Sequence, residues 1–354
     1  MPTEYGAKWL WMLVWLSCTF GCQLKNESQQ YNQLEELRVL AIQAEPPDLV
    51  PGETTTLSAL VFEPNDAAIS YEWSWCPARA ASSDGFGCTL SEAELAALWS
   101  GLGTGIPAPS YDLGTSPTAE FTHVFPMAVV LGICAALAGD SEASDLALFA
   151  CLQGLEISVS LKVRSGGDEI TAIKTLTMLD EGAMADSRNN NPDPTGNMKI
   201  TLAGRELAAG EQLQPNSIYE ITAEFDRGMQ CDSEVSVADD CIAESFLPEK
   251  REGLDEPTPR RETITMTWFL TMGVTEDEGG SREGTRDNAG NRHSSEYKGG
   301  DTTSFVDGGE LRKLLENIWT LPFVPEDDQA QLFLVVRDER GGIGWTSYSY
   351  SVER

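Results

Sequence analysis

The chain has 354 residues and a formal net charge of −32 at pH 7, with a sequence pI of about 4.2. A surface this acidic repels the phosphate backbone of nucleic acids and anionic lipid headgroups, so we expect no nucleic-acid partner and no membrane binding through basic patches. The charge favours solubility and cationic or divalent-metal partners, and the length suits two domains that can each bury a core.

The first 22 residues have the pattern of an export signal. A polar head precedes an uncharged apolar run, Trp9–Phe20, which is too short to cross a bilayer. The run closes on a glycine followed by Cys22, and bacterial lipoproteins carry a small residue directly before the lipidated cysteine. We therefore predict a lipoprotein signal peptide over residues 1–21 with lipidation at Cys22, and Cys18 is the alternative site.

Lipidation would anchor the chain in the outer membrane, on the periplasmic or the cell-surface face. Stable anchoring needs several acyl chains, because one chain binds only marginally. Residues 22–36 are polar and are predicted to form a flexible tether. One alternative is ordinary signal-peptidase cleavage, which would give a secreted protein, and another is a short buried N-terminal helix.

The six cysteines that follow the signal fall into three neighbouring couples. Export places them in an oxidising environment, and no couple has the C-x-x-C spacing of a zinc site, so we expect structural disulfides. Each short loop closed in this way would contribute roughly 2–4 kcal/mol, although the sequence alone does not prove the pairing. The predicted pairs are Cys76 with Cys88, Cys134 with Cys151, and Cys231 with Cys241.

The first predicted domain spans residues 37–179. Short strands separated by turns rich in Pro, Gly, Asn and Asp are typical of a β-sandwich. Tyr71, Trp73 and Trp75 alternate with polar residues and share one face, which we interpret as core, with a ligand-stacking platform as the alternative. The predicted strands are Leu37–Ala44, Thr54–Phe62, Ile69–Trp75, Leu155–Val163 and Glu169–Leu179.

A helical insertion is predicted over about residues 89–152. Ser91 and Glu94 have the spacing of a capping box, which starts a helix that runs to Trp99. Residues 101–117 are rich in Gly, Pro and Ser and are predicted to be a loop. Two further helices are expected over residues 127–138 and 144–152, and the first of them is apolar nearly all round and must be buried.

Residues 180–197 contain an Asn-Asn-Asn-Pro-Asp-Pro run and are predicted to be an interdomain linker. The second domain, residues 198–354, repeats the sandwich pattern with long acidic loops, and one short helix is expected over Leu311–Trp319. Its predicted strands are Met198–Leu202, Tyr219–Phe225, Ile264–Leu270, Leu332–Arg337 and Ile343–Val352.

Several of these strands carry a resemblance to known proteins. They are Val39–Pro47, which leads through Pro51-Gly52 to Tyr71–Pro77, and Ile264–Phe269 with Val335–Gly342 in the second domain. Here and in its signal, the chain resembles exported bacterial lipoproteins with Ig-like or PKD-like modules, in particular the uncharacterised lipoproteins abundant in myxobacteria. The resemblance implies a β-sandwich on a lipid tether and supplies no catalytic residues.

We therefore predict a mainly β chain with two Ig-like or PKD-like β-sandwich domains, of which the first carries the helical insertion. The sequence contains no nucleophile elbow, no Walker loop, no HExxH and no EF-hand loop. It predicts no cofactor and no catalytic residue. Calcium is the one alternative, and the candidate ligands are Asp287, Asn288 and Asn291, because extracellular modules often bind calcium weakly through oxygen ligands.

The favoured function is that of a non-enzymatic, lipid-anchored cell-envelope protein whose domains serve adhesion, scaffolding or ligand binding. Its partners would be the membrane, through the anchor, and an envelope protein or a carbohydrate. The alternative is a secreted hydrolase or carbohydrate-processing protein with a carboxylate site in the long loops. Converging carboxylates with raised pKa values in a cleft would favour the enzyme, and filled sandwich cores would favour the binding protein.

Overall fold

Residues 32–354 form one compact unit in the structure, which is a computed structural model. No helix among the described residues is long and apolar enough to cross a membrane. The described residues are 33–77, 87–101, 108–125, 129–130, 133, 155–179, 188–225, 244–246, 260–262, 264–275, 296–298, 316–322 and 328–353.

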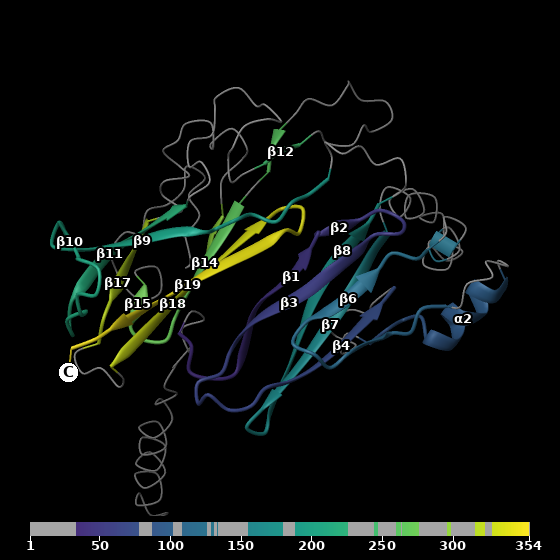
Figure 1. Cartoon of the computed structure of the whole chain (residues 1–354), viewed down its shortest axis with the longest axis horizontal. Helices are drawn as coiled ribbons and strands as arrows, with labels where there is room; N and C mark the ends of the chain where they lie inside the picture. The colour runs from purple at the N-terminus through teal and green to yellow at the C-terminus, as the bar shows by residue number, and fades with distance from the viewer. Residues whose placement is uncertain are drawn as a thin grey trace, which may run out of the picture. The chain divides into compact units, whose positions relative to one another are not determined.

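The first sandwich packs a three-stranded antiparallel sheet against a five-stranded sheet (Figure 1). Their facing side chains form one apolar core, in which Trp73 and Trp75 are completely enclosed. The three-stranded sheet has the order β1 (Arg38–Glu45), β3 (Thr54–Phe62) and β6 (Ala119–Thr122). The five-stranded sheet has the order β2 (Asp48–Leu49), β8 (Asp168–Met178), β7 (Leu155–Ser165), β4 (Ser70–Cys76) and β5 (Asp112–Gly114).

Strict alternation builds the central hairpin of this sandwich. Along β7, Ile157, Val159 and Leu161 are buried while the residues between them are more exposed, as expected where one face of a strand packs on a core. The tight turn to β8 contains Gly166 and Gly167, which both have positive φ angles. Two-residue hairpin turns need such angles, which glycine adopts without steric cost.

The helical insertion begins as the sequence predicts. Helix α2 (Glu92–Gly101) starts with a capping box, in which the Glu94 amide donates to Ser91 Oγ at 3.2 Å and the Ser91 amide donates to Glu94 Oε2 at 2.8 Å. Leu95 and Trp99 pack onto the first core. Of the second expected helix, residues 129, 130 and 133 are helical and buried, and the third lies outside the described residues.

The second sandwich has a four-stranded and a five-stranded sheet around its own core, in which Trp268 and Trp319 are fully buried. The four-stranded sheet has the order β16 (Glu296–Lys298), β14 (Ile264–Leu270), β18 (Gln329–Asp338) and β19 (Ile343–Ser351). The five-stranded sheet has the order β10 (Arg205–Glu206), β9 (Gly196–Leu202), β11 (Ile218–Phe225), β17 (Glu316–Thr320) and β15 (Val274–Thr275). A small ladder joins β12 (Ser245–Phe246) to β13 (Arg260–Arg261).

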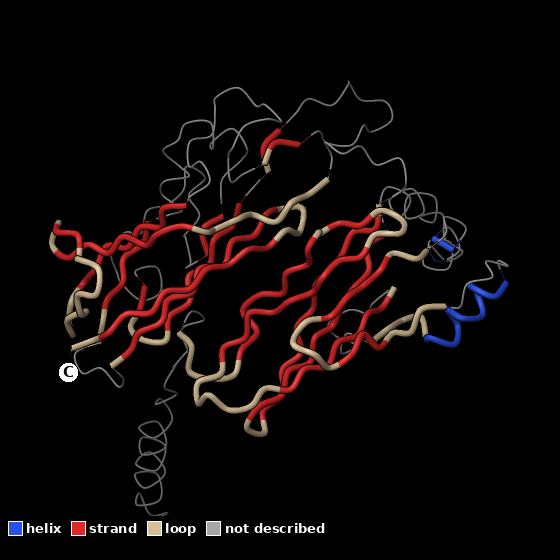
Figure 2. Tube along the Cα trace, in the orientation of Figure 1, coloured by secondary structure: helices blue, strands red, loops and turns tan. Residues whose placement is uncertain are grey.

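A third apolar layer joins the two sandwiches, and the strands that form it run side by side in Figure 2. In this layer the outer face of β1 and β3 packs on the outer face of β14 and β18, so that Leu40 and Ala41 meet Phe269 and Val335. Strands β14 and β18 are thereby buried on both faces, which explains why the sequence of β18 is a nearly continuous apolar run instead of an alternating one.

One element prediction is wrong. Residues 316–320, which fall largely in the helix expected over Leu311–Trp319, form strand β17, and it pairs with β11 along five residues from Ile218↔Thr320 to Thr222↔Glu316. Trp319 is fully buried against the second core, and its indole nitrogen donates to the Met272 carbonyl at 2.8 Å. Pairing in the sheet and burial of the indole therefore override the local helical pattern.

The expected loop and tether are also more ordered than their composition indicates. Strand β5 falls within residues 101–117. At the end of the predicted tether, Gln33 forms a parallel bridge with Leu270, and the Leu34 amide donates to the Leu270 carbonyl at 2.7 Å. Because Leu34 is buried in the third apolar layer, the docked part of the chain begins before residue 37.

Candidate functional site

The interface between the sandwiches has two different ends. Strand β14 runs along it from Ile264, which pairs with Asp338, to Leu270, which pairs with Leu332 and contacts the incoming chain at Gln33. We call the end at Gln33 the tether end and the end at Asp338 the junction end. Seven strand residues separate the two ends by roughly 20 Å.

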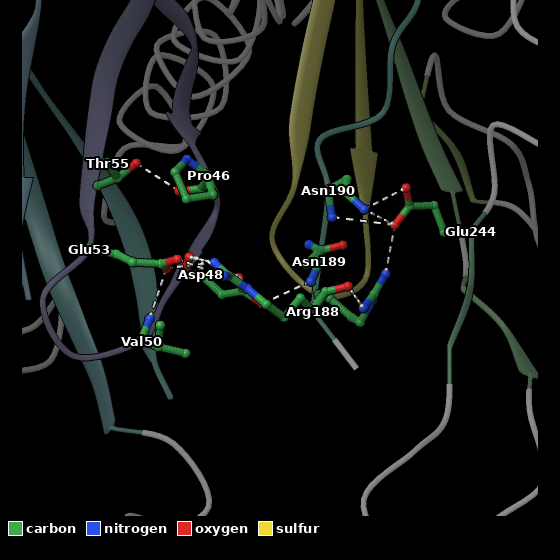
Figure 3. A network of polar contacts seen from close by, with 10 residues as sticks. Pro46, Asp48, Val50, Glu53, Thr55, Arg188, Asn189, Asn190 and Glu244 are labelled. Carbon is green, nitrogen blue, oxygen red and sulfur yellow. Dashed lines mark hydrogen bonds and ion pairs between the residues drawn. The ribbon is translucent and has the colours of Figure 1, made fainter. Parts of the chain in front are cut away.

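The junction end holds a dense network of polar side chains, drawn in part in Figure 3. Its centre is the stretch Arg188–Asn191, which leads from one sandwich to the other and lay within the predicted linker. The stretch forms hydrogen bonds to both sandwiches, so the linker holds the two domains together. We call this network the polar junction, and it comprises Asp48, Glu53, Lys174, Arg188, Asn189, Asn190, Asn191, Glu244, Glu262, Asp338 and Arg340.

Arg188 fixes the linker to the first sandwich. Its guanidinium donates to both oxygens of Glu53, at 2.8 and 2.7 Å, and its Nε donates to Asp48 Oδ1 at 3.3 Å. Such a planar fork matches a carboxylate in two bonds at once. On the other side, the Arg188 carbonyl accepts a hydrogen bond from Arg340 Nη1 at 3.1 Å, so the same residue contacts the second sandwich.

Asn189 spans the two sandwiches in the same way and is only 4% exposed. Its backbone amide donates to Asp48 Oδ2 at 2.8 Å, and its side-chain amide donates to both oxygens of Asp338 at 3.2 Å. Asp338 also accepts hydrogen bonds from the backbone amides of Arg340 and Gly342. Asn189 Oδ1 is buried and has no hydrogen-bond partner among the described residues.

Asn191 also forms hydrogen bonds to both sandwiches. Its Nδ2 donates to the carbonyl of Ala44, at the end of β1, at 2.7 Å, and its Oδ1 accepts from the amide of Ile343, at the start of β19, at 2.8 Å. The neighbouring Asn190 donates to Glu244 at 3.0 Å. Because an asparagine amide both donates and accepts, one side chain can satisfy backbone groups of two domains.

Arg340 and Lys174 bring positive charge to the junction. Arg340 donates to Glu262 Oε2 at 3.0 Å and to Glu244 Oε2 at 3.2 Å, and its side chain is only 14% exposed. Lys174, on β8 of the first sandwich, donates directly to the carbonyl of Gly341 in the turn between β18 and β19. This turn therefore receives contacts from the linker and from the first sandwich.

Burial controls the pKa values in the polar junction. Loss of water raises the pKa of the Glu262 carboxyl to about 8, and the nearby charge of Asp338 adds to the rise. Burial likewise raises the pKa of Asp338 and lowers the pKa of Lys174 to about 8. By contrast, the hydrogen bond from Arg188 lowers the pKa of Glu53 below its ordinary value.

The two carboxyl groups with raised pKa values are enclosed. The side chain of Glu262 is 1% exposed, and each of its oxygens accepts a hydrogen bond, one from Arg340 and one from the Glu244 amide. Asp338 is 8% exposed and accepts from three residues. A catalytic acid or base must be accessible to its substrate. The enclosed geometry of these two carboxyls therefore suits a role in holding the domains together.

The structure describes only some of the residues predicted for a site. Cys76 and Cys88 are joined by a disulfide, as the sequence predicts. The remaining cysteines and calcium candidates lie outside the described residues, namely Cys18, Cys22, Cys134, Cys151, Cys231, Cys241, Asp287, Asn288 and Asn291. Among the described residues there is no group of three His, Cys, Asp or Glu side chains that could hold a metal ion.

The tryptophans of β4 are core residues. Trp73 and Trp75 are at most 1% exposed, and their indole nitrogens donate to the carbonyls of Ser116 and Ser110 at 3.0 and 2.6 Å. This confirms the core interpretation for these two side chains and removes them as a stacking platform. The sequence does not predict the polar junction, although its three consecutive asparagines predict a linker.

The sheets and their cores define the class of this protein as a mainly β protein of two β-sandwiches that share a buried interface. Neither a family model nor a curated protein matches the chain.

Similar solved structures include the C-terminal domain of the antigen I/II-family protein AspA of Streptococcus pyogenes, at 10% identity over 90% of this chain and 100% of that chain, with a TM-score of 0.20. A carbohydrate-binding module of the β-sandwich superfamily is 11% identical over 89% of this chain and 95% of that chain, with a TM-score of 0.22. The adhesin InvE of Yersinia pseudotuberculosis is 9% identical over 88% of this chain and 58% of that chain, with a TM-score of 0.16.

Proposed function

We propose that this chain is a non-enzymatic, lipid-anchored protein of the bacterial cell envelope, which binds an envelope protein or a carbohydrate at the junction end of its two sandwiches. The observation that carries the proposal is that the two ends of the interface between the sandwiches differ. The chain enters at Gln33 at the tether end, and it leaves strand β8 after Met178 and strand β11 after Phe225 at the junction end. Anchoring at one end thus leaves the other end for a partner.

The length of the tether supports this arrangement. From the predicted lipid site at Cys22 to the docked residue Gln33 there are roughly 11 residues, which span at most about 40 Å when fully extended. A flexible chain of that length has a typical end-to-end distance of about 20 Å. The tether end would therefore stay close to the membrane, while the third apolar layer and the polar junction hold both sandwiches in one orientation.

Lipidation is tested by labelling cells with a radioactive fatty acid and comparing the wild-type chain with Cys22→Ala and Cys18→Ala. The proposal expects label in the wild type and in Cys18→Ala, and none in Cys22→Ala. An unlabelled wild-type chain would contradict anchoring, and loss of label only in Cys18→Ala would move the lipid site to Cys18.

Binding is tested by capturing partners from solubilised envelopes on the full chain, with and without a chelator. We expect a specific protein or polysaccharide to be retained. Loss of that partner on chelation would support calcium as a bridging ion. If the captured envelope material is instead hydrolysed, with no partner retained, the non-enzymatic proposal is wrong and the hydrolase alternative takes its place.

A further inference from the structure

We infer that the unpaired edge of strand β3, over Ser58–Phe62, is a docking site for an extended basic segment of a partner protein, which adds to the sheet as a further strand. The site lies in the half of the first sandwich nearer the tether end, because Phe62 pairs with Arg38 at the start of β1. It is separate from the proposed binding face at the junction end, and the inference does not depend on lipidation.

Strand β3 has two neighbours along only part of its length. Strand β1 pairs with it from Thr56 to Phe62, whereas β6 pairs with it only from Thr54 to Leu57. Beyond Leu57, no strand among the described residues pairs with that side of β3. Successive residues of a strand direct their backbone N–H and C=O groups to opposite sides, so about half of these groups in Ser58–Phe62 face the unpaired side. A row of such groups is a template for another strand.

Burial along β3 changes at the point where β6 ends. The core-facing residues Thr55 and Leu57 lie beside β6 and are completely buried. The next two core-facing residues, Ala59 and Val61, are only half-buried, although they pack on the same core. The missing neighbour therefore leaves apolar side chains of the first core partly exposed.

The facing sheet is incomplete at the same place. Strand β5 pairs with β4 at Trp73 and Ser74, and Trp73 is completely buried there. Ile69 and Tyr71, which come before that pair and pack on the same core, are only half-buried. Because β5 and β6 contact each other, the unpaired parts of β3 and β4 lie on the same side of the sandwich. Alternate apolar side chains of an added strand would pack on the core between them.

The unpaired part of β3 lacks the features with which proteins protect an exposed strand edge. Charged side chains, proline and bulges usually prevent the addition of another strand. Ser58–Phe62 has the sequence Ser-Ala-Leu-Val-Phe, with no charged residue and no proline. The register shift beside it places the extra residue in β1, between Val39 and Ala41.

Two other strands of the same sheet are protected in this way. Strand β6 is short and carries the exposed Glu120. In β1, the carbonyls of Leu40 and Ala44 accept hydrogen bonds from the side chains of Arg337 and Asn191, both at or below 2.9 Å. The contrast indicates that the edge at Ser58–Phe62 is kept available for a partner.

The charge around this edge selects the kind of partner. Residues 46–77, which include β3 and β4, contain five acidic residues and no Lys, Arg or His. Three of the five are in ion pairs with Arg188 or Arg164, which leaves Glu63 and Asp66 in the turn after β3. Glu120 adds a negative charge near the other end of the unpaired part.

A strand flanked by Lys or Arg would therefore match the charges at both ends of the site. The basic side chain opposite Phe62, Arg38, lies on β1 and is 3.7 Å from Glu36. A second copy of this chain would itself bring a net charge of −32, so electrostatic repulsion disfavours it as the occupant.

Titration with a peptide of sequence KKVTVTVKK, blocked at both ends, tests the site on the full chain in detergent. We expect the peptide to bind and to slow hydrogen exchange in residues 58–62 by about fivefold or more, while exchange in β19 stays unchanged. The matched control is the same peptide with every amide of its VTVTV segment methylated. It keeps the charge and the apolar side chains but cannot pair with β3, so it should neither bind nor protect.

Two results of this titration would overturn the inference. The first is that the unmodified peptide does not bind at about 1 mM, and the second is that the methylated peptide binds equally well. Sedimentation of the chain without peptide tests the remaining occupant. A dimer whose β3 amides are already protected would assign the edge to a second copy and overturn the choice of a basic partner.

Two variants locate the site. Val61→Lys places a charge on the inner side of the unpaired edge and should weaken peptide binding about tenfold or more. Ile170→Lys is the matched control, because Ile170 is half-buried in the same core but lies on β8, and this variant should bind as the wild type does. Urea unfolding shows whether both variants are folded.

Unchanged binding in a folded Val61→Lys, or equal weakening in both variants, would contradict a site at this edge. If Val61→Lys does not fold, the comparison of the two peptides on the wild-type chain decides the question.

Discussion

Replacing Glu262 by glutamine changes how the stability of the protein depends on pH. In the unfolded chain a glutamate has a pKa near 4.5, whereas burial raises the pKa of Glu262 to about 8 in the folded protein. The folded state therefore holds this proton more tightly. The stabilising contribution of the protonated group is fully present below pH 4.5 and is lost as the pH rises to about 8.

The size of the effect follows from the difference in pKa. One pKa unit corresponds to about 1.4 kcal/mol of free energy. The rise in the pKa of Glu262 from 4.5 to about 8 therefore corresponds to at most about 5 kcal/mol in the free energy of unfolding. Arg340 and the Glu244 amide still donate hydrogen bonds to the charged Glu262 carboxylate. Ionisation of Glu262 therefore lowers the free energy of unfolding while the chain stays folded. Between pH 5 and pH 8, the free energy of unfolding of the wild type should fall by several kcal/mol relative to Glu262→Gln.

Urea unfolding followed by tryptophan fluorescence measures this difference at pH 5, 6, 7 and 8. The difference between the two proteins is the informative quantity, because the remaining carboxylates titrate in both. If the two stability curves run parallel from pH 5 to pH 8, Glu262 has an ordinary pKa and the argument from burial is refuted.

Three further substitutions test the interface and the insertion. Asn191→Ala removes the hydrogen bonds to Ala44 and Ile343 and should lower the free energy of unfolding, measured in urea, by about 1–3 kcal/mol. Asn197 is exposed, so the control Asn197→Ala should change that free energy by less than about 0.5 kcal/mol. Phe333→Ala empties part of the third apolar layer and should cost about 3–5 kcal/mol in the same assay; a loss below about 1 kcal/mol would contradict tight packing there. Cys88→Ser opens a disulfide of sequence separation 12 and should cost about 2–3 kcal/mol, so an unchanged melting temperature under oxidising conditions would refute its structural role.

The strands were the most predictable part of this protein. Residues that alternate between apolar and polar, as in β7 and β11, carry their burial pattern in the sequence, and the structure buries the same faces. The continuous apolar run of β18 was also predicted as a strand. Only the structure explains why β18 is apolar along its length: its outer face is covered by the other sandwich, so both faces are buried.

Strand β17 and the polar junction were not predictable in the same way. Residues 316–320 have a pattern that a short helix could also have, and their pairing with β11 depends on residues almost 100 positions away. The junction gathers side chains from residues 48 to 340, most of them in irregular segments between strands. Charged and asparagine-rich turns are common at exposed loops, so local composition gave no signal that these would be buried together.

Whether the two sandwiches behave as one unit is measured most directly by differential scanning calorimetry of the full chain at pH 6. The third apolar layer and the polar junction predict one cooperative transition, in which the calorimetric and van't Hoff enthalpies agree. Two separate transitions, one for each sandwich, would show that the interface does not couple them and would contradict the account.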